Sequence, residues 1–220
     1  MPTVFLTGAN RGIGLAFVQS YAASGWRVLA TCRAPETAGV LKAVPGDIAA
    51  HALEVTDEAQ LAALATSLRD EKIDVLINNA GVGGEESTEG WLRMLHINCI
   101  APIQIAHALL PLVLRSERRV IASITSGMGS ISDNSSGGSY AYRSSKAALN
   151  AAMKSLSVDL VKRGASVIVI NPGWVRTDMG GAGARLTAAD SVARMRKLVD
   201  NAGPAQSGKF FNYDGSEYPW

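Results

Sequence analysis

Short apolar runs alternate with longer amphipathic segments along most of the chain. The short runs are rich in β-branched residues, which favours strands, and they cover residues 3–7, 26–32, 51–55, 75–78, 119–124, 166–171 and 208–212. The longer segments repeat apolar residues at helical spacing and cover residues 12–24, 57–71, 89–115, 140–163 and 187–201. This alternation is typical of a parallel sheet with helices on both faces. Residues 35–47 fit either a turn or a shortened helix.

Residues that begin or end helices stand at the borders of these segments. Gly25 and Gly164 follow the first and fourth helices, and Asp57 and Thr187 precede the second and the last. No internal repeat or linker interrupts the pattern. We therefore predict a single α/β domain over residues 1–220, of the Rossmann type, doubly wound, with a mostly parallel seven-stranded sheet.

Composition narrows the class of protein. With 220 residues, 47% of them hydrophobic, the chain can bury a core without disulfides or structural metal. Cys32 and Cys99 are then expected to be small buried apolar residues, which excludes a secreted disulfide scaffold. A net charge of +2 is too small to indicate nucleic acid as a partner. The three histidines lie far apart, so no metal site is expected.

No segment looks like a membrane or export signal. No apolar stretch approaches the ~20 residues that span a bilayer. Residues 1–11 lack the basic start and long apolar stretch of a secretory signal. We expect a cytoplasmic protein with no membrane partner.

The glycine-rich turn after the first strand is the first candidate binding site. Right-handed crossovers place the carboxyl ends of all parallel strands at one edge of the sheet, where ligands bind. Glycines there permit a tight turn and let backbone N–H groups approach a pyrophosphate at the start of a helix. The alternative is a purely structural turn, but its position between strand and helix favours dinucleotide binding. The turn comprises Gly8, Asn10, Arg11, Gly12, Ile13 and Gly14.

The residue after the second strand predicts which dinucleotide binds. An acidic residue there would bind the ribose hydroxyls of NAD, whereas an arginine pairs with the 2′-phosphate of NADP. The chain has Arg33 at this point and Arg11 as a second cation in the turn. Unless both are ordinary surface charges, NADPH/NADP is preferred over NAD.

A tyrosine, a lysine and a serine form the candidate proton-transfer site. Tyr142 and Lys146 are four residues apart and share a helix face. A cation beside a phenol favours the phenolate, so we expect a lowered tyrosine pKa, although the lysine could also simply cover the helix surface. Ser126 ends the preceding strand at the same edge, while Ser123 is expected to be buried within that strand.

Taken in order, these motifs resemble the short-chain dehydrogenase/reductase family over essentially the whole chain. Beyond the glycine turn and the Tyr142/Lys146 pair, the resemblance rests on residues 78–81, Asn98, Ser126 and residues 171–173. The segments 140–143 and 208–215 resemble the carbonyl-reductase-like branch that includes the C-factor-type proteins.

The resemblance implies a role for each residue. Tyr142 would be the general acid in reduction and the general base in oxidation, and Lys146 would bind the nicotinamide ribose and lower the tyrosine pKa. Ser126 would orient the substrate carbonyl, and Asn98 would support a water-linked proton path, besides acting as a buried hydrogen-bonding amide. The remaining cofactor contacts would be Glu54, Val55, Asn79, Ala80 and Gly81 on the adenine-ribose side and Pro172, Gly173 and Thr177 at the nicotinamide end.

Two features depart from the family pattern. Glu54 stands where many relatives have aspartate, and the interval between Ser126 and Tyr142 is a few residues longer, with a polar insert at residues 133–138.

The glycines of the segment 178–187 predict a mobile lid. An apolar wall could come from Met128, Trp174 and Met179, although residues of these types are more often part of the core.

The function we expect is NADPH-dependent transfer of a hydride between nicotinamide and a carbonyl or alcohol substrate. A dinucleotide-binding signalling or regulatory protein of the C-factor type, with incidental turnover, is the alternative. An epimerase or dehydratase usually needs a larger C-terminal region than the residues that follow Thr177. The family often pairs helices near 89–115 and 140–163 between subunits, which implies a homodimer or homotetramer.

Overall fold

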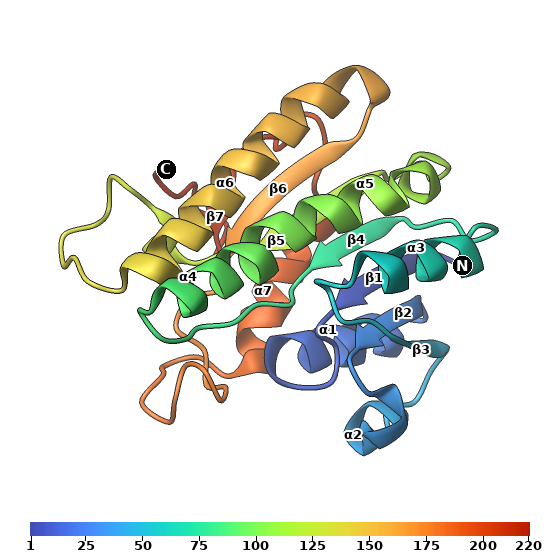
Figure 1. Ribbon diagram of the computed structural model, residues 1–220. Helices are drawn as coiled ribbons and strands as arrows, with labels where there is room; N and C mark the ends of the chain where they lie inside the picture. The colour runs from blue at the N-terminus through green and yellow to red at the C-terminus, as the bar shows by residue number, and fades with distance from the viewer.

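The computed structural model describes residues 1–220, in which all seven strands join one parallel sheet. The strand order is β3-β2-β1-β4-β5-β6-β7 (Figure 1). The chain starts in the middle of the sheet, builds outward to β3, and crosses back to build the other half, which is the doubly wound topology predicted. The strands are β1 (Thr3–Thr7), β2 (Arg27–Cys32), β3 (Ile48–Ala52), β4 (Val75–Asn78), β5 (Val120–Ile124), β6 (Ser166–Asn171) and β7 (Phe210–Asn212).

Helices cover both faces of the sheet and leave the carboxyl edge open. On one face α3, α5 and α6 pack against Phe5, Leu76 and Val167, and on the other α1 and α7 pack against alternate residues such as Val4 and Ile77. Strand side chains alternate between the two cores because successive residues point to opposite faces. The helices are α1 (Gly12–Ala23), α2 (Gly39–Lys42), α3 (Glu58–Ser67), α4 (Thr88–Leu95), α5 (Ala101–Leu114), α6 (Tyr140–Leu160) and α7 (Ala188–Asp200).

The strand predicted at residues 51–55 is placed wrongly by three residues. The structure puts β3 at Ile48–Ala52, with Ile48 beside Val28 and Ala52 beside Cys32. Most of this edge strand is not buried, so its hydrophobic pattern is weak, while the buried Leu53 and Val55 follow it. The ambiguous segment 35–47 forms a 3₁₀ turn, Pro35–Thr37, followed by the short α2.

A continuous helical run joins α4 to α5 through a π-helical turn, His96–Ile100. This run, Thr88–Leu114, has 27 residues and is long and apolar enough to cross a membrane by length and composition alone. The sequence expectation that no such stretch exists is therefore wrong. The more buried part of the run belongs to the core, where Ala101, Ile105 and Leu109 pack under the sheet.

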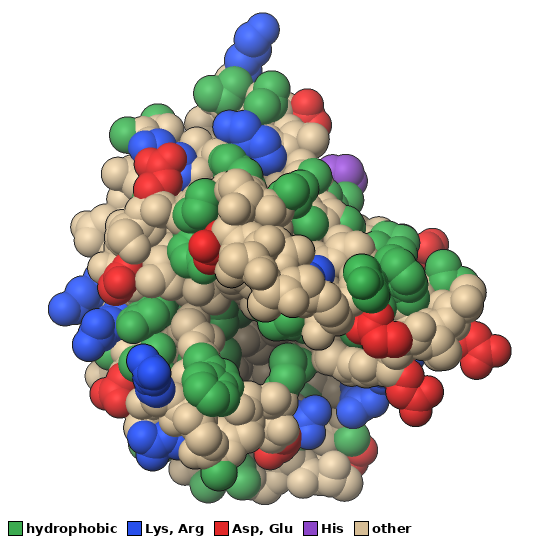
Figure 2. Space-filling model, turned by 90° about the vertical axis from the view of Figure 1, so that its left-hand side faces the viewer, with side chains coloured by type: hydrophobic (Ala, Val, Ile, Leu, Met, Phe, Trp, Pro, Cys, Tyr) green, Lys and Arg blue, Asp and Glu red, His purple; other side chains and the backbone are tan.

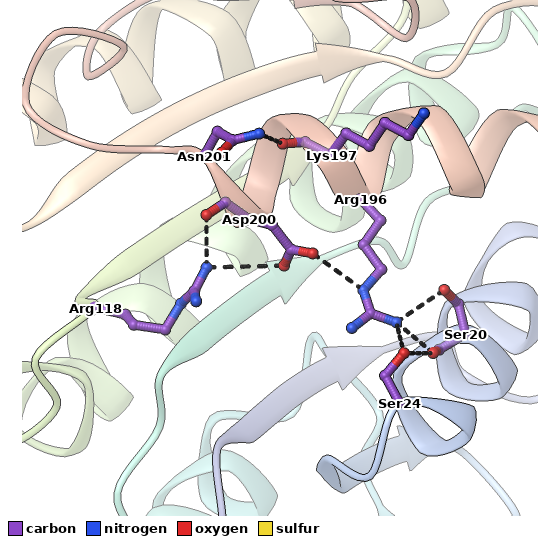
Figure 3. A network of polar contacts seen from close by, with 7 residues as sticks. All are labelled: Ser20, Ser24, Arg118, Arg196, Lys197, Asp200 and Asn201. Carbon is purple, nitrogen blue, oxygen red and sulfur yellow. Dashed lines mark hydrogen bonds and ion pairs between the residues drawn. The ribbon is translucent and has the colours of Figure 1, made fainter.

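A cationic network ties α7 to the rest of the molecule at the amino ends of β2 and β5, away from the open edge. Arg196 of α7 reaches Ser20 and Ser24 at the end of α1, and Asp200 lies between Arg196 and Arg118 (Figure 3). The guanidinium carbon of Arg196 lies 4.2 Å from the ring centre of Tyr21. This network locks the helix that follows the segment 173–187 against the first βα unit.

Candidate active site

The open edge of the sheet collects the loops that follow β1, β2, β4, β5 and β6. Figure 2, turned so that this side faces the viewer, shows a hollow in the middle of the surface. The N-terminus of α6 and the segment 173–187 lie on this side in Figure 1. Residues that are far apart in the sequence meet here because parallel strands all end at the same edge.

The glycine-rich turn has two positions that only glycine can occupy, so its backbone is not covered by side chains there. A Cβ on Gly14 would lie 2.0 Å from the carbonyl oxygen of Gly8, and Gly8 itself has a φ of +66°. Both positions therefore exclude other residues. Arg11 is the N-cap of α1 but makes no side-chain capping hydrogen bond, in contrast to Asp57 of α3 and Thr187 of α7. The first turn of α1 thus presents uncapped N–H groups, which fits a pyrophosphate.

The loop after β4 is anchored to this turn. The hydroxyl oxygen of Thr7 accepts hydrogen bonds from the main-chain N–H groups of Asn79 and Ala80, both at 3.0 Å. The side chain of Asn79 donates to the carbonyl oxygens of Thr7 and Gly8. Asn79 therefore holds the glycine turn in shape, a structural role that the prediction of an adenine-ribose contact did not include.

The predicted phosphate-binding arginines have different partners. Arg33 is exposed at the end of β2, and no ion pair or hydrogen bond engages its guanidinium. Arg11 forms an ion pair with Asp178 at 3.1 Å, between side chains that are 69% and 81% exposed. This pair joins the cofactor turn to the loop that follows β6.

The other predicted residues of the adenine-ribose side lie at the end of β3. One carboxylate oxygen of Glu54 accepts from the Thr56 hydroxyl at 3.2 Å, so the side chain turns back toward the start of α3. Val55 is buried in the core beside it. At the glycine turn, Ile13 packs partly against the other core, and Asn10 is exposed.

Ser126 and Tyr142 meet at the end of β5. The side chain of Ser126 lies close enough to the Tyr142 phenol to lower its pKa, and the Ser126 oxygen accepts from the main-chain N–H of Met128 at 3.1 Å. Ser123, by contrast, is buried within β5, as expected. Two of the three residues assigned to proton transfer are thus neighbours at this edge.

Burial, rather than the neighbouring lysine, dominates the pKa of Tyr142. Desolvation raises this pKa above its usual value, and the nearby Ser126 hydroxyl offsets only part of the rise. The predicted lowering is therefore wrong for the structure as it stands. Lys146 is buried, and desolvation lowers its pKa to about 8. Its ammonium donates to the carbonyl oxygen of Ile124 at 3.0 Å, so the lysine is held in place by the end of β5.

Asn98 lies in the π-helical turn and is fully buried. Its side-chain oxygen accepts from the N–H of Val82 at 2.9 Å, and its amide nitrogen donates to the carbonyl of Val82 and to Ser145. A Cβ on Gly81 would lie 3.3 Å from Asn98 Oδ1 and 3.5 Å from Lys146 Nζ. Asn98 and Lys146 therefore border the same small space beside Gly81.

The loop after β6 closes on itself beside the glycine turn. The indole of Trp174 donates to the carbonyl of Gly180 at 2.8 Å, and Val175 pairs with Leu186. A Cβ on Gly12 would lie 3.2 Å from a methyl carbon of Thr177, so this loop lies directly on the cofactor turn. Pro172 and Gly173 connect it to β6, and the carbonyl of Pro172 accepts from Ser191 of α7.

The family model for short chain dehydrogenases matches residues 2–187 of the chain. The chain belongs to the short-chain dehydrogenase/reductase family. It is an NAD(P)-dependent oxidoreductase, of the carbonyl-reductase-like and C-factor-type branch that the sequence motifs indicate.

Three similar proteins illustrate this branch. C-signal of Myxococcus xanthus is 45% identical over 164 residues, which cover 72% of this chain and 99% of that protein. The carbonyl reductase Sniffer of D. melanogaster is 33% identical, with a TM-score of 0.95 over 100% of both chains. The NADPH-bound carbonyl reductase from chicken fatty liver is 34% identical, with a TM-score of 0.94 over 100% of this chain and 94% of that one.

Sequence reasoning missed several residues that shape this short-chain dehydrogenase/reductase site. Ser145 donates to the carbonyl of Tyr142 at 2.8 Å and accepts from Asn98, so it links two of the predicted residues. Asp178 pairs with Arg11. The serine could have been found from its position three residues after Tyr142, where a hydroxyl can reach back to the helix backbone. Asp178 carried no such local signal.

Proposed function

We propose that this protein is an NADPH-dependent carbonyl reductase in which Tyr142 is the proton donor. The observation that carries the proposal is that the side chains of Tyr142 and Ser126 are neighbours at the open edge of the sheet, with Lys146 buried behind them. This edge also bears the bare glycine turn. A carbonyl oxygen placed between the two hydroxyls could accept hydrogen bonds from both.

The residues divide the work between orientation and proton supply. Bound nicotinamide supplies the hydride, and the protein supplies alignment and the proton. The Ser126 hydroxyl is oriented by the N–H of Met128, so its own proton is free to point toward the substrate oxygen. Tyr142 donates the proton that converts the oxygen to an alcohol. Because its pKa is raised by burial, Tyr142 holds this proton throughout the neutral range, which suits reduction.

The decisive test of this function uses a panel of aldehydes, ketones and quinones, assayed by loss of reduced-nicotinamide absorbance. We expect the unchanged protein to reduce at least one compound. Tyr142→Phe should lower kcat by about 100-fold or more, because it removes the general acid while keeping the ring. A Tyr142→Phe variant with normal turnover would defeat the mechanism, although the fold would remain.

The preference for NADPH rests on two cations near the ends of β1 and β2. Arg33 is exposed with no acidic partner, so it is available to a phosphate, and Arg11 lies in the adjoining turn. The similar chicken carbonyl reductase was solved with NADPH bound. Titration calorimetry should give a lower Kd for NADPH than for NADH, and Arg33→Ala should reduce that preference by about tenfold. Equal affinities in the unchanged protein would contradict the preference.

A signalling or regulatory role is the second candidate, favoured by the 45% identity with C-signal. In this case dinucleotide binding would matter and turnover would be incidental. A Tyr142→Phe/Lys146→Ala double variant separates the two functions. Biological output that survives in a double variant that still binds cofactor would favour the signalling role, whereas its loss favours the enzyme.

We also propose that the protein forms a homodimer or homotetramer through α4, α5 and α6. Large apolar side chains are exposed on α4, on the π-helical turn that joins it to α5, and on α6, namely Leu92, Ile100 and Val158. Exposed apolar side chains gathered on neighbouring helices are typical of an interface. Light scattering after size-exclusion chromatography should give a multiple of the chain mass, and Val158→Glu should shift it toward the monomer.

A further inference from the structure

The last residues of the chain fold back onto the sheet. The main-chain N–H of Tyr218 donates to the carbonyl of Phe210 at 2.7 Å, and the two rings lie 5.0 Å apart between centres. The ring of Trp220 lies 5.5 Å from that of Phe210, which is fully buried. Residues 218–220, here called the tail, are thus fixed to β7 by a hydrogen bond and by aromatic packing.

The main-chain oxygen of Trp220, the last residue of the tail, accepts hydrogen bonds from residues 130–132 in the loop that follows β5. The main-chain oxygen of Trp220 accepts from the N–H groups of Ile131 and Ser132 at 3.1 and 2.9 Å. It also accepts from the hydroxyls of Ser130 and Ser132 at 3.2 and 2.7 Å. Four donors from three consecutive residues therefore converge on one acceptor, and this contact bridges about 90 positions of sequence.

Tyr218 binds the same region at two further points. Its hydroxyl donates to Asp133 at 2.6 Å, and this hydrogen bond raises the pKa of Tyr218 to about 12, so the hydroxyl keeps its proton. The same oxygen lies against Gly127, where an added Cβ would be only 2.8 Å away. The tail therefore contacts the first residue of the turn Gly127–Gly129 and the residues that follow the turn.

This turn is the element that orients the Ser126 hydroxyl. Ser126 is its N-cap, and the serine oxygen accepts from the N–H of Met128 while its carbonyl accepts from Gly129. The N–H of Ser130 closes the turn on Gly127 at 3.0 Å. A displacement at residues 130–133 would therefore be transmitted through a single 3₁₀ turn to the serine beside Tyr142.

We propose that the tail is a positioning element for catalysis, and that Tyr218 is a positioning residue that acts on the substrate through Gly127 and Ser126. The effect on rate rests on the carbonyl reductase activity proposed above. Misplacing a group that binds the reacting atoms by about 1 Å can cost about 100-fold in rate, so a loosened turn should cost about five- to tenfold.

A double-mutant cycle tests the route through the serine. Tyr218→Phe should lower kcat by about five- to tenfold and leave the Kd of NADPH unchanged, and Asp133→Asn should reproduce this loss from the loop side. In a Ser126→Ala background, Tyr218→Phe should cost less than about twofold, because the group that it positions is gone. A full loss in the Ser126→Ala background would overturn the proposal.

Hydrogen exchange tests the same proposal without any assay of turnover. Tyr218→Phe should speed amide exchange of residues 127–133, whereas Glu217→Gln should not. Glu217 is the matched control because it lies in the same stretch of chain, where it pairs with the exposed Lys209 at 3.1 Å and not with the loop. Unchanged exchange in Tyr218→Phe would refute the positioning role. If the unchanged protein reduced no carbonyl compound, the proposed function would fail, and the exchange rates would still decide whether the tail holds the turn.

Discussion

The ammonium nitrogen of Lys146 lies 5.9 Å from the ring centre of Tyr142, and its hydrogen bond goes to the carbonyl oxygen of Ile124. The lysine is thus a buried cation beside the phenol rather than a direct hydrogen-bond partner of it. Burial acts in opposite directions on the two residues, because it penalises the charged form of each. It raises the pKa of Tyr142 and lowers that of Lys146 to about 8.

The lysine pKa predicts how turnover depends on pH. Below about pH 8 the ammonium is protonated, and above that value it becomes neutral. If the charge is needed for proton transfer and ribose binding, kcat with saturating NADPH should be flat from about pH 6 and fall through an inflection near the lysine pKa. The measurement is kcat against pH in buffers of constant ionic strength. A flat profile up to about pH 10 would show that the lysine charge is not required.

The ion pair between Arg11 and Asp178 predicts a competition for the cofactor. The carboxylate occupies a guanidinium that a phosphate could otherwise bind, so Asp178→Asn should lower the Kd of NADPH. The pair is largely exposed, so we expect only about a two- to fivefold change, and a smaller one at high salt. Calorimetry with NADPH measures this effect. Asp159→Asn, an equal charge change on the exposed face of α6, should have none.

Replacing a glycine of the glycine-rich turn by alanine should weaken NADPH binding, whereas the same replacement at an open position elsewhere should not. Gly14→Ala would place a Cβ 2.0 Å from the carbonyl oxygen of Gly8, so the turn must open. We expect NADPH binding to weaken by about 100-fold, because a backbone shift removes several N–H contacts at once, and stability to fall by about 1–3 kcal/mol. Gly39→Ala, which meets no atom within 4 Å, is the control and should bind normally. Normal binding by Gly14→Ala would disprove this role of the turn.

Replacing Arg196 should lower the stability of the fold without changing catalysis. Its guanidinium stacks on Tyr21 and contacts Ser20 and Ser24, and an ammonium cannot reproduce this planar arrangement (Figure 3). Arg196→Lys should lower the free energy of unfolding by about 1–2 kcal/mol, measured by urea titration, with kcat unchanged. Arg93→Lys, at an exposed arginine of α4 that has no ion pair and no aromatic ring beneath it, should lower it less. Equal losses in the two variants would mean that the stacking contributes little.

The local hydrophobic pattern predicted the positions of the strands correctly wherever a strand is buried on both faces. β1, β4 and β6 lie at the predicted residues because their runs are buried on both faces and end at polar or turn residues. The edge strand β3 has no such burial, and its register is decided by pairing with β2. The π-helical turn at Asn98 could not be read from the sequence either, because it depends on contacts with Val82 and Ser145.

By itself the sequence determined the succession of strands and helices along the chain, the position of the glycine turn, and the helix face that Tyr142 and Lys146 share. These features depend on spacings of a few residues, which backbone geometry converts directly into local structure. Only the tertiary structure decided which way the pKa of Tyr142 moves, which partner Arg11 takes, and that Tyr218 contacts the turn beside Ser126. Desolvation, ion pairing and packing between distant segments depend on what the folded chain brings together, and no local spacing encodes them.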